Sequence, residues 1–376
     1  MLLNVSEVQT KKDIKEFIRL PYGVYRGKGE RYDAWVPPLD LDIRHIMDRK
    51  NPIYDHTEGK FWLVRENGKT LGRIAAFIDR NFIEFQKTKT GFFGFFECYN
   101  HQEAANALFA EAEKWLKAKG MEKTLGPVNG STNYQLGNQI DSFDEMPVIE
   151  MPYSAPFYGK LIEEYGFVKA RDLYSYRMNV SENDLSEKFY RVSAIAAERN
   201  GIKIRLANMR NWDAEVAIVK EIWEDAWHDN WGFTPWYEPE FKAMAKNLKL
   251  VMIPELTYIA EINGEAVGFC FPIPDVNFAF HRINGKLFPT GIFHLLSARK
   301  KSKNLRVAAF GVKKRFQNKG VDSIMIAKLR KDGLATNHLY IGEFSWILDT
   351  NYPLRNLLEK WGCERYRTHR VYEKNL

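Results

Sequence analysis

The chain has 376 residues with 45% hydrophobic and 14% aromatic side chains, enough for the cores of two ordinary domains, and no apolar run nears the roughly 18 residues of a membrane-spanning helix. Its three cysteines form no Cys-x-x-Cys motif and its eight histidines lack metal-ligand spacing, so we expect free thiols in a reducing cytoplasm and no metal. The formal net charge of +7 suits an anionic ligand, but no recognition motif accompanies it, so we expect no nucleic-acid partner.

The first half of the chain predicts a helix, a series of strands and a second, longer helix. Apolar spacing indicates a helix over 11–19, and Pro21 is expected to end it because proline lacks a backbone N–H. Asn100 and Glu103 have the spacing of a capping box for the longer helix, and the turn-rich loop 126–133 is typical of a functional segment. Strands are expected near 61–66, 70–78, 91–98, 123–128 and 172–179, with helices at 101–119 and 156–165.

Polar residues at 181–184 mark the boundary with the second half. This half predicts a helix near 184–199, a strand at 203–206 and an amphipathic helix over 216–226. The tryptophans that follow either line an apolar pocket or pack a lid helix, and both interpretations stay open for Trp227, Trp231 and Trp236.

An apolar insertion with a basic end follows a predicted hairpin at 257–273. It spans residues 278–303, has no counterpart in the first half, and ends in the basic cluster 299–303. Such a segment suits a cover for an acyl chain, a contact with a membrane surface, or an ordinary packed lid.

Two markers repeat in the chain at one offset of 196 residues. Residues 61–72 and 257–268 each contain two apolar runs around Asn-Gly, the strongest short hairpin signal. Residues 161–167 and 357–363 each read as a helix end closed by glycine. Because both markers keep one offset, the chain is predicted to contain two copies of one unit.

Residues 312–323, Val-Lys-Lys-Arg-Phe-Gln-Asn-Lys-Gly-Val-Asp-Ser, carry the clearest chemical signal. They join an apolar strand at 305–312 to helical spacing from Ile324 onward, so a basic loop leads into a helix N-terminus. The free N–H groups and partial positive charge of such an end suit a phosphate, and Gly320 would let the ligand approach. The basic residues of the loop are Lys313, Lys314, Arg315 and Lys319. With the cluster 299–303 they are expected to form a positive rim around the phosphate site; the alternative is a solvated basic surface.

This loop resembles the acyl-CoA loop of the GNAT acyltransferases. Val312, Gln317 and Gly320 match the family's spacing, whereas Asp322 stands where the family has a small residue. The hairpin before the loop and the glycine-closed helix after it follow the family's order in both halves.

The resemblance implies an α/β (α+β) fold of two tandem GNAT-like domains, 1–182 and 183–376, each a mixed, mostly antiparallel sheet flanked by helices. It implies that the second domain binds acetyl-CoA or a longer acyl-CoA. The first half lacks a glycine loop after its strand 91–98, so we expect one CoA per chain and a first half that walls the acceptor site. The residues that the resemblance assigns to acyl-CoA are Phe310, Val312, Gln317, Asn318, Lys319, Gly320, Val321 and Ser323.

In this family the acyl group enters between two splayed strands, and a base takes the proton of the amine. Glu343, a lone acid in the apolar strand 339–348, is the candidate base, because burial would raise its pKa; a structural glutamate bonded to an arginine is the alternative. Asn351 matches an asparagine of the family at the start of the next helix, and Asp349 is the reserve base. Leu358 stands where many members have a tyrosine that protonates the thiolate.

The resemblance therefore implies an acyl-CoA-dependent N-acyltransferase that acts on a small-molecule or lipid-like amine, with long-chain (sphingoid-like) amino alcohols as one class of acceptor. Two alternatives stay open. One is a catalytically degenerate protein that holds CoA or lipid, favoured by Asp322 and Leu358. The other is an aminoacyl-tRNA-dependent peptidyl transferase, which would need a tRNA-binding element. The expected location is the cytoplasm, and peripheral contact with the inner membrane surface is left open.

Overall fold

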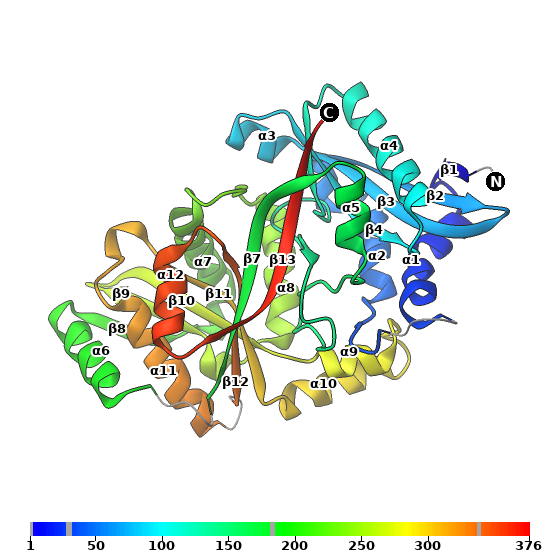
Figure 1. Ribbon diagram of the computed structural model, residues 1–376. Coiled ribbons are helices and arrows are strands. Elements are labelled where there is room, and N and C mark those ends of the chain that lie inside the picture. The colour runs from blue at the N-terminus through cyan, green and yellow to red at the C-terminus, as the bar shows by residue number, and fades with distance from the viewer. Residues whose placement is uncertain (1–2, 28–31, 181–184, 337–339) are drawn as a thin grey trace. The chain divides into compact units, whose positions relative to one another are not determined.

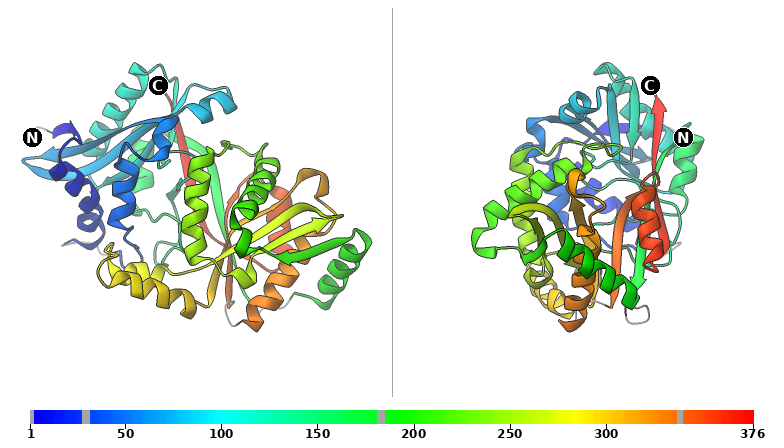
Figure 2. Two further views of the ribbon diagram at one scale, coloured as in Figure 1. Left: turned by 180° about the vertical axis from the view of Figure 1, so that it is seen from behind. Right: turned by 90° about the vertical axis from the view of Figure 1, so that its left-hand side faces the viewer.

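The computed structural model describes residues 3–27, 32–180, 185–336 and 340–376, which group into two compact units (Figures 1 and 2). The first unit contains Met1–Tyr174 together with Asn277–His294 and Arg367–Leu376, and the second contains Ser175–Val276 and Leu295–Tyr366. Two segments from the second half of the sequence thus belong to the first unit. The predicted boundary at 181–184 lies outside the described residues, so the domain limits 1–182 and 183–376 stay a prediction.

The first unit is a sheet flanked by helices. Its strands β1 to β5 are neighbours in chain order, β4 and β5 run parallel, and β13 follows antiparallel to β5. The strands are β1 (Leu3–Glu7), β2 (Thr57–Glu66), β3 (Lys69–Asp79), β4 (Thr90–Cys98), β5 (Lys123–Gly126), β6 (Asn138–Gln139) and parts of β7 (Val168–Asn179) and β13 (Glu364–Asn375). The helices are α1 (Lys11–Arg26), α2 (Asp40–Met47), the short 3-10 helix η1 (Pro52–Asp55), α3 (Arg80–Gln86), α4 (Gln102–Ala118) and α5 (Tyr158–Glu164).

Neighbouring residues of β3 show how the helices cover this sheet. Gly72 lies against Leu108 of α4, where a Cβ would be only 2.8 Å from the leucine side chain. Arg73 points to the other face and donates to the carbonyl of Phe17 in α1. Because successive residues of a strand face opposite sides, α4 and α1 cover opposite faces (Figure 1).

The second unit has the same layout. Strands β8 to β12 are neighbours in the order β12-β11-β10-β9-β8, and β11 and β12 are parallel. Helix α7 packs on Gly311 through Trp227, while α11 packs on Gly268, a residue that pairs with Val312. The strands are β8 (Ile202–Leu206), β9 (Tyr258–Ile262), β10 (Glu265–Pro274), β11 (Asn304–Val312) and β12 (Ile341–Leu348). The helices are α6 (Glu187–Arg199), α7 (Trp212–Trp227), α8 (Glu238–Val251), α11 (Val321–Ala335), α12 (Tyr352–Lys360) and the 3-10 helices η2 (Met209–Asn211), η3 (Pro254–Leu256) and η4 (Lys314–Phe316).

Backbone registers confirm the predicted duplication. The hairpins close at Glu66–Lys69 and Ile262–Glu265, around Asn-Gly pairs with positive φ in both copies. The helix ends are bonded alike, Phe167 N–H to Ile162 and Cys363 N–H to Leu358. The segment that follows the hairpin is 18 residues longer in the second copy. Equivalent backbone bonds show this, because Tyr99 N–H bonds the carbonyl of Leu71 in the first copy and Lys313 N–H bonds that of Val267 in the second.

The 18 extra residues belong to the predicted insertion, which is helical. It forms α9 (Asn277–Ile283) and α10 (Gly291–Lys301). Its first part is held in the first unit: the Asn277 amide donates to the carbonyl of Pro147, and Tyr22 and Arg26 donate to Asn284.

Two local predictions are wrong. Helix α1 does not end at Pro21 but continues to Arg26. The carbonyl of Phe17, four residues earlier, would normally accept the N–H that proline lacks, and it accepts a hydrogen bond from buried Arg73 at 2.6 Å instead. The long helix α4 is capped by the ring of His101, which accepts the Ala104 N–H, and not by Asn100.

All three cysteines are free and buried, as the composition predicts. Burial raises the pKa of Cys98 and of Cys363 to about 12, so neither thiol ionises at neutral pH. In the described ranges, no helix combines the length and the apolar character needed to cross a bilayer.

Candidate functional site

The parallel strands β11 and β12 separate halfway along their length. They pair with each other from Asn304–Ile341 to Val307–Phe344. Beyond that point β11 continues to Val312 and β12 to Leu348, but the two strands no longer pair with each other. A bulge in the pairing of β10 with β11 leaves Ala308 as an extra residue, which lies at the start of this gap. Next to this gap Ala308, Ala309 and Phe310 of β11 are half-buried residues.

The corresponding place in the first unit is filled by the chain itself. After β5 ends at Gly126, Val128 N–H bonds the carbonyl of Phe93 at 2.7 Å. The side chain of Asn129 accepts the N–H of Phe95 at 2.8 Å. Gly94, the counterpart of Ala308, is so close to this segment that a Cβ on it would lie 2.1 Å from the Val128 oxygen. The loop 126–133 thus bonds the edge of β4 at the place where, among the described residues, no segment after β12 bonds the edge of β11.

The loop predicted to hold a phosphate leads into α11 as expected. Gly320 precedes the helix with φ +87°, and within the described part of the chain no side chain caps the first-turn N–H groups. Two side-chain amides hold the loop: the Gln317 amide donates to the carbonyl of Val312 at 3.2 Å, and Asn200, the residue after α6, donates to that of Lys319 at 3.0 Å. Gly320 has a further role that the sequence does not reveal, since a Cβ on it would lie 2.8 Å from Cβ of Ala196 in α6.

The other residues assigned to acyl-CoA lie close to this loop. Val312 and Val321 are buried, with 8% and 1% exposure, so they can offer only backbone groups to a ligand. Asn318 takes φ +61°, and the Ser323 hydroxyl is 3.4 Å from the carboxylate of Asp322. Among the residues described, no group of three or more His, Cys, Asp or Glu is arranged to hold a metal ion.

The expected positive rim does not form as one surface, because the cluster 299–303 precedes β11 and the loop follows it, so the length of the strand separates them. In the loop itself, three of the four cations have carboxylate partners. Lys313 bonds Glu221 at 2.6 Å and Glu265 at 3.1 Å. Burial lowers the pKa of Lys313, but the hydrogen bonds and negative charges of the two glutamates together outweigh it, and the net pKa is raised. Lys314 pairs with Asp229 and Arg315 with Glu265, so the phosphate-binding potential of this loop comes chiefly from its backbone.

Glu343 is buried, with 2% exposure, and accepts a short hydrogen bond of 2.5 Å from the Tyr366 hydroxyl. Alternation along β12 puts it on the same buried face as Ser345, as predicted. Its register neighbour on β11 is Arg306, whose guanidinium donates to the Ser345 hydroxyl at 3.0 Å. The neighbouring arginine favours a structural role for Glu343. Its place one residue before the strands separate favours a role as base.

The sequence does not indicate Tyr366, because nothing local distinguishes it within β13. Its ring lies under the guanidinium of Arg177, 4.6 Å from the ring centre, so Tyr366 joins β12 and β7. Only the return of β13 to the sheet brings it to Glu343.

The remaining predicted residues serve α12. The side chain of Asn351 caps this helix by accepting the Leu354 N–H at 3.3 Å, and the Asp349 carbonyl accepts a bond from Arg355. Leu358 of α12 is fully buried, and so is its counterpart Ile162 of α5. Both helices therefore have an apolar core residue at this position.

The tryptophans differ in how they pack. Trp236 is 7% exposed and packs on Phe241 between α7 and α8, as an ordinary lid residue does. Trp227 stacks on Trp223 at 4.3 Å between ring centres and lies over Gly311, beside the open end of β11.

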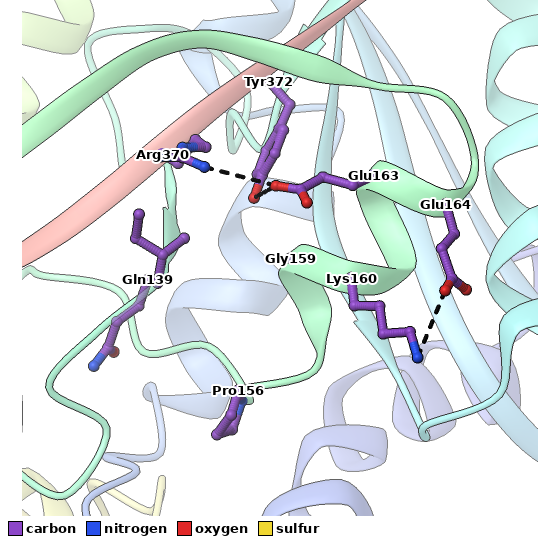
Figure 3. Close-up of a pocket in the computed structure, with 9 residues that line it drawn as sticks. Gln139, Pro156, Gly159, Lys160, Glu163, Glu164, Arg370 and Tyr372 are labelled. Carbon is purple, nitrogen blue, oxygen red and sulfur yellow. Dashed lines mark hydrogen bonds and ion pairs between the residues drawn. The ribbon is translucent and has the colours of Figure 1, made fainter.

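Each unit contains a cavity. One of about 290 Å³ lies between α6 and the start of α11, lined by Ser186, Lys188, Phe189, Val192, Ser193, Ala196, Gly320 and Ser323. A larger one of about 600 Å³ belongs to the first unit (Figure 3). There Tyr372 donates to Glu163 at 3.1 Å, and Arg370 is held by Asp172 at 2.9 Å. Its charges are satisfied internally, so we assign it no part in the chemistry.

Comparison with known proteins gives a consistent picture. No family model matches the chain. The bacterial ceramide synthase of Caulobacter vibrioides is 34% identical, over all of this chain and 98% of its own. Protein YghO of Escherichia coli (strain K12) is 33% identical over 97% of this chain and 94% of its own.

Solved structures agree on the fold. A tandem GNAT protein from the clavulanic acid biosynthesis pathway has a TM-score of 0.58 at 12% identity and covers all of this chain and 98% of its own. A GCN5-related N-acetyltransferase from Sphaerobacter thermophilus has a TM-score of 0.55 at 12% identity, over 99% and 95% of the two chains. The predicted tandem GNAT fold is confirmed.

Proposed function

Because the chain belongs to the tandem GNAT-fold family of the Caulobacter vibrioides ceramide synthase and of protein YghO, we propose that it is an acyl-CoA-dependent N-acyltransferase with one acyl-CoA site, in its second unit. The observation that carries the proposal is the open gap between β11 and β12, which ends beside the uncapped start of α11. A thioester between the strands would have its phosphates at those helix N–H groups.

The residues present fit this group. The gap offers backbone of β11 at Ala308 to Phe310, and a backbone N–H there would polarise the thioester carbonyl. When bound, acyl-CoA supplies the activated acyl group and a thiolate leaving group. The first unit is closed to it, because Asn129 already occupies the N–H of Phe95.

We assign proton removal from the amine to the pair Tyr366 and Glu343. The Tyr366 hydroxyl donates to Glu343, so it can accept a proton from the amine while it passes its own to the carboxylate. Asn351 acts as a positioning residue, since its cap fixes the helix that follows β12.

The acceptor we propose is a long-chain amine. One relative is named a bacterial ceramide synthase, and a ceramide is the amide of a fatty acid with a long-chain amino alcohol. The stacked Trp223 and Trp227 beside the end of β11 support an apolar acceptor. Each CH₂ group buried against such a surface contributes about 0.8 kcal/mol, so chain length should strongly affect turnover.

A grid of substrates tests the proposal. Long-chain and two-carbon acyl-CoA donors are each combined with a long-chain amino alcohol and a short amine, and the release of free CoA is followed. We expect the fastest turnover with the long-chain amine. Preference for a short polar amine would overturn the acceptor class, and acyl-CoA binding without turnover in any pair would favour the degenerate binder.

Two variants test the proton path. Glu343→Gln and Tyr366→Phe should each lower kcat by about 100-fold or more while acyl-CoA binding stays unchanged, since a proton-transfer group contributes about that factor. Both should also shift the pH profile of kcat. If kcat is unchanged and only the free energy of unfolding falls, the pair is structural.

A further inference from the structure

Helix α10 exposes two of its four large apolar side chains, while Ile292 and Leu295 are half-buried. Phe293 is 70% exposed and Leu296 55%, whereas small Ala298 on the opposite side is 2% exposed. Phe293, Leu296 and Lys300 are spaced three and seven residues apart, so they share one face of the helix. An ordinary lid would bury the phenylalanine and leucine and expose the alanine, so packing on the protein does not account for this face of the helix.

The turn before α10 continues this exposed apolar surface. Phe288 is 67% exposed, and the turn is joined to the helix by hydrogen bonds from Ile292 N–H to Leu287 and from Phe293 N–H to Thr290. Single exposed apolar residues are common on protein surfaces, but three within nine residues of one turn and helix form a patch.

The charge of this segment is of one sign. Residues 277–303 contain no Asp or Glu, although the whole chain has 48 acids. Lys300 and Lys301 are exposed at the end of α10, directly after the apolar face. The cations of the segment are Arg282, Lys286, Arg299, Lys300, Lys301 and Lys303.

We propose that α10 and the turn before it form a docking surface for an anionic lipid bilayer. Phe288, Phe293 and Leu296 would enter the boundary between headgroups and acyl chains, and Lys300 and Lys301 would reach the lipid phosphates. The charge argues against a second copy of this chain as the occupant, because a symmetric interface would bring these basic segments together. The proposal extends the proposed activity, since a long-chain amine resides in such a bilayer, but it does not depend on turnover.

Sedimentation with vesicles tests the proposal on the full chain. The protein is mixed with vesicles of phosphatidylcholine alone, or of phosphatidylcholine with about one third phosphatidylglycerol, and the bound fraction is measured at low and high salt. We expect binding to the anionic vesicles that weakens with salt, and little binding to the neutral ones.

Two double variants separate the apolar and the charged contributions. Phe293→Ser/Leu296→Ser and Lys300→Glu/Lys301→Glu should each lower the partition coefficient more than about tenfold, because each removes one of the two attractions. The matched controls are Val168→Ser/Ile195→Ser, which are also exposed apolar residues, and Lys117→Glu/Lys331→Glu, which make the same change in net charge. These controls should bind like the parent.

Three results would overturn the proposal: no binding to anionic vesicles, equal binding to neutral and anionic vesicles, or equal loss in the controls. Self-association that Phe293→Ser/Leu296→Ser abolishes, without vesicle binding, would assign the surface to a second copy instead. Far-ultraviolet circular dichroism and acyl-CoA affinity should be unchanged in all variants, which shows that they fold.

Discussion

The two copies of the repeated unit differ most where β4 meets β5 in the first and β11 meets β12 in the second. In the first copy the chain after β5 stays against β4, with Val128 bonded to Phe93 and Asn129 bonded to Phe95. In the second copy the pairing stops at Val307–Phe344 and the strands part. One fold therefore has one copy closed by its own loop and one copy in which no described segment bonds the strand edge beyond the paired residues.

This difference shows that a binding slot in this fold depends on the chain segment that comes after the second strand of the pair. A bulged strand exposes N–H groups that must be satisfied, and either the chain's own polar atoms or a ligand can satisfy them. In the first copy the side chain of Asn129 accepts the N–H of Phe95. In the second copy a ligand can accept the corresponding N–H groups of β11.

The largest expected effect comes from exchanging the residue at the start of the gap. Gly94→Ala should lower the free energy of unfolding by about 3 kcal/mol or more, because its Cβ would lie 2.1 Å from a backbone oxygen. The reverse change in the second copy, Ala308→Gly, should cost only about 0.5–1 kcal/mol, the usual penalty of glycine in a strand. Urea denaturation measures both, and equal costs would mean that the two gaps are alike.

The next effect concerns the start of α11. Ser323→Glu places a carboxylate beside the proposed pyrophosphate and should weaken acyl-CoA binding by about 100-fold in calorimetry. Glutamate in the first turn suits the helix dipole, so stability should not fall. The control is Asn100→Glu, an exposed residue before α4 in the first copy, which should leave affinity unchanged. The parent should bind one acyl-CoA per chain, and two would contradict the closed state of the first copy.

A smaller effect is expected from removing the side chain that closes the first copy. Asn129→Ala leaves the N–H of Phe95 without its acceptor and should cost about 1–3 kcal/mol of stability. Asn129→Asp keeps the acceptor and should cost less. Acyl-CoA stoichiometry should stay at one in both variants, because the backbone of Val128 still fills the gap.

The smallest effect concerns the acid that departs from the family pattern. Asp322→Asn removes one negative charge near the phosphates while it preserves shape, and should tighten acyl-CoA binding by about threefold to tenfold at low salt. The gain should shrink as salt rises. Weaker binding in the variant would mean that Asp322 supports the ligand.

Much of this architecture can be predicted from local patterns. The Asn-Gly hairpins, the glycine-closed helices and their common offset indicate the duplication, because turns with positive φ and helix ends depend on a few adjacent residues. The basic glycine loop before α11 is predictable for the same reason, and so is the asymmetry between the copies, since only one has that loop. The buried position of Glu343 follows from alternation along β12.

Other features depend on contacts between residues far apart in the chain. Pro21 signals a helix end, but Arg73, 52 residues later, satisfies the freed carbonyl and the helix continues. Asn129 looks like a residue of a functional loop, and only its place beside β4 shows that it closes a gap. Tyr366 reaches Glu343 because β13 returns to the sheet. A sequence read locally identifies turns, caps and faces; which buried polar groups satisfy one another is decided when the folded chain brings them together.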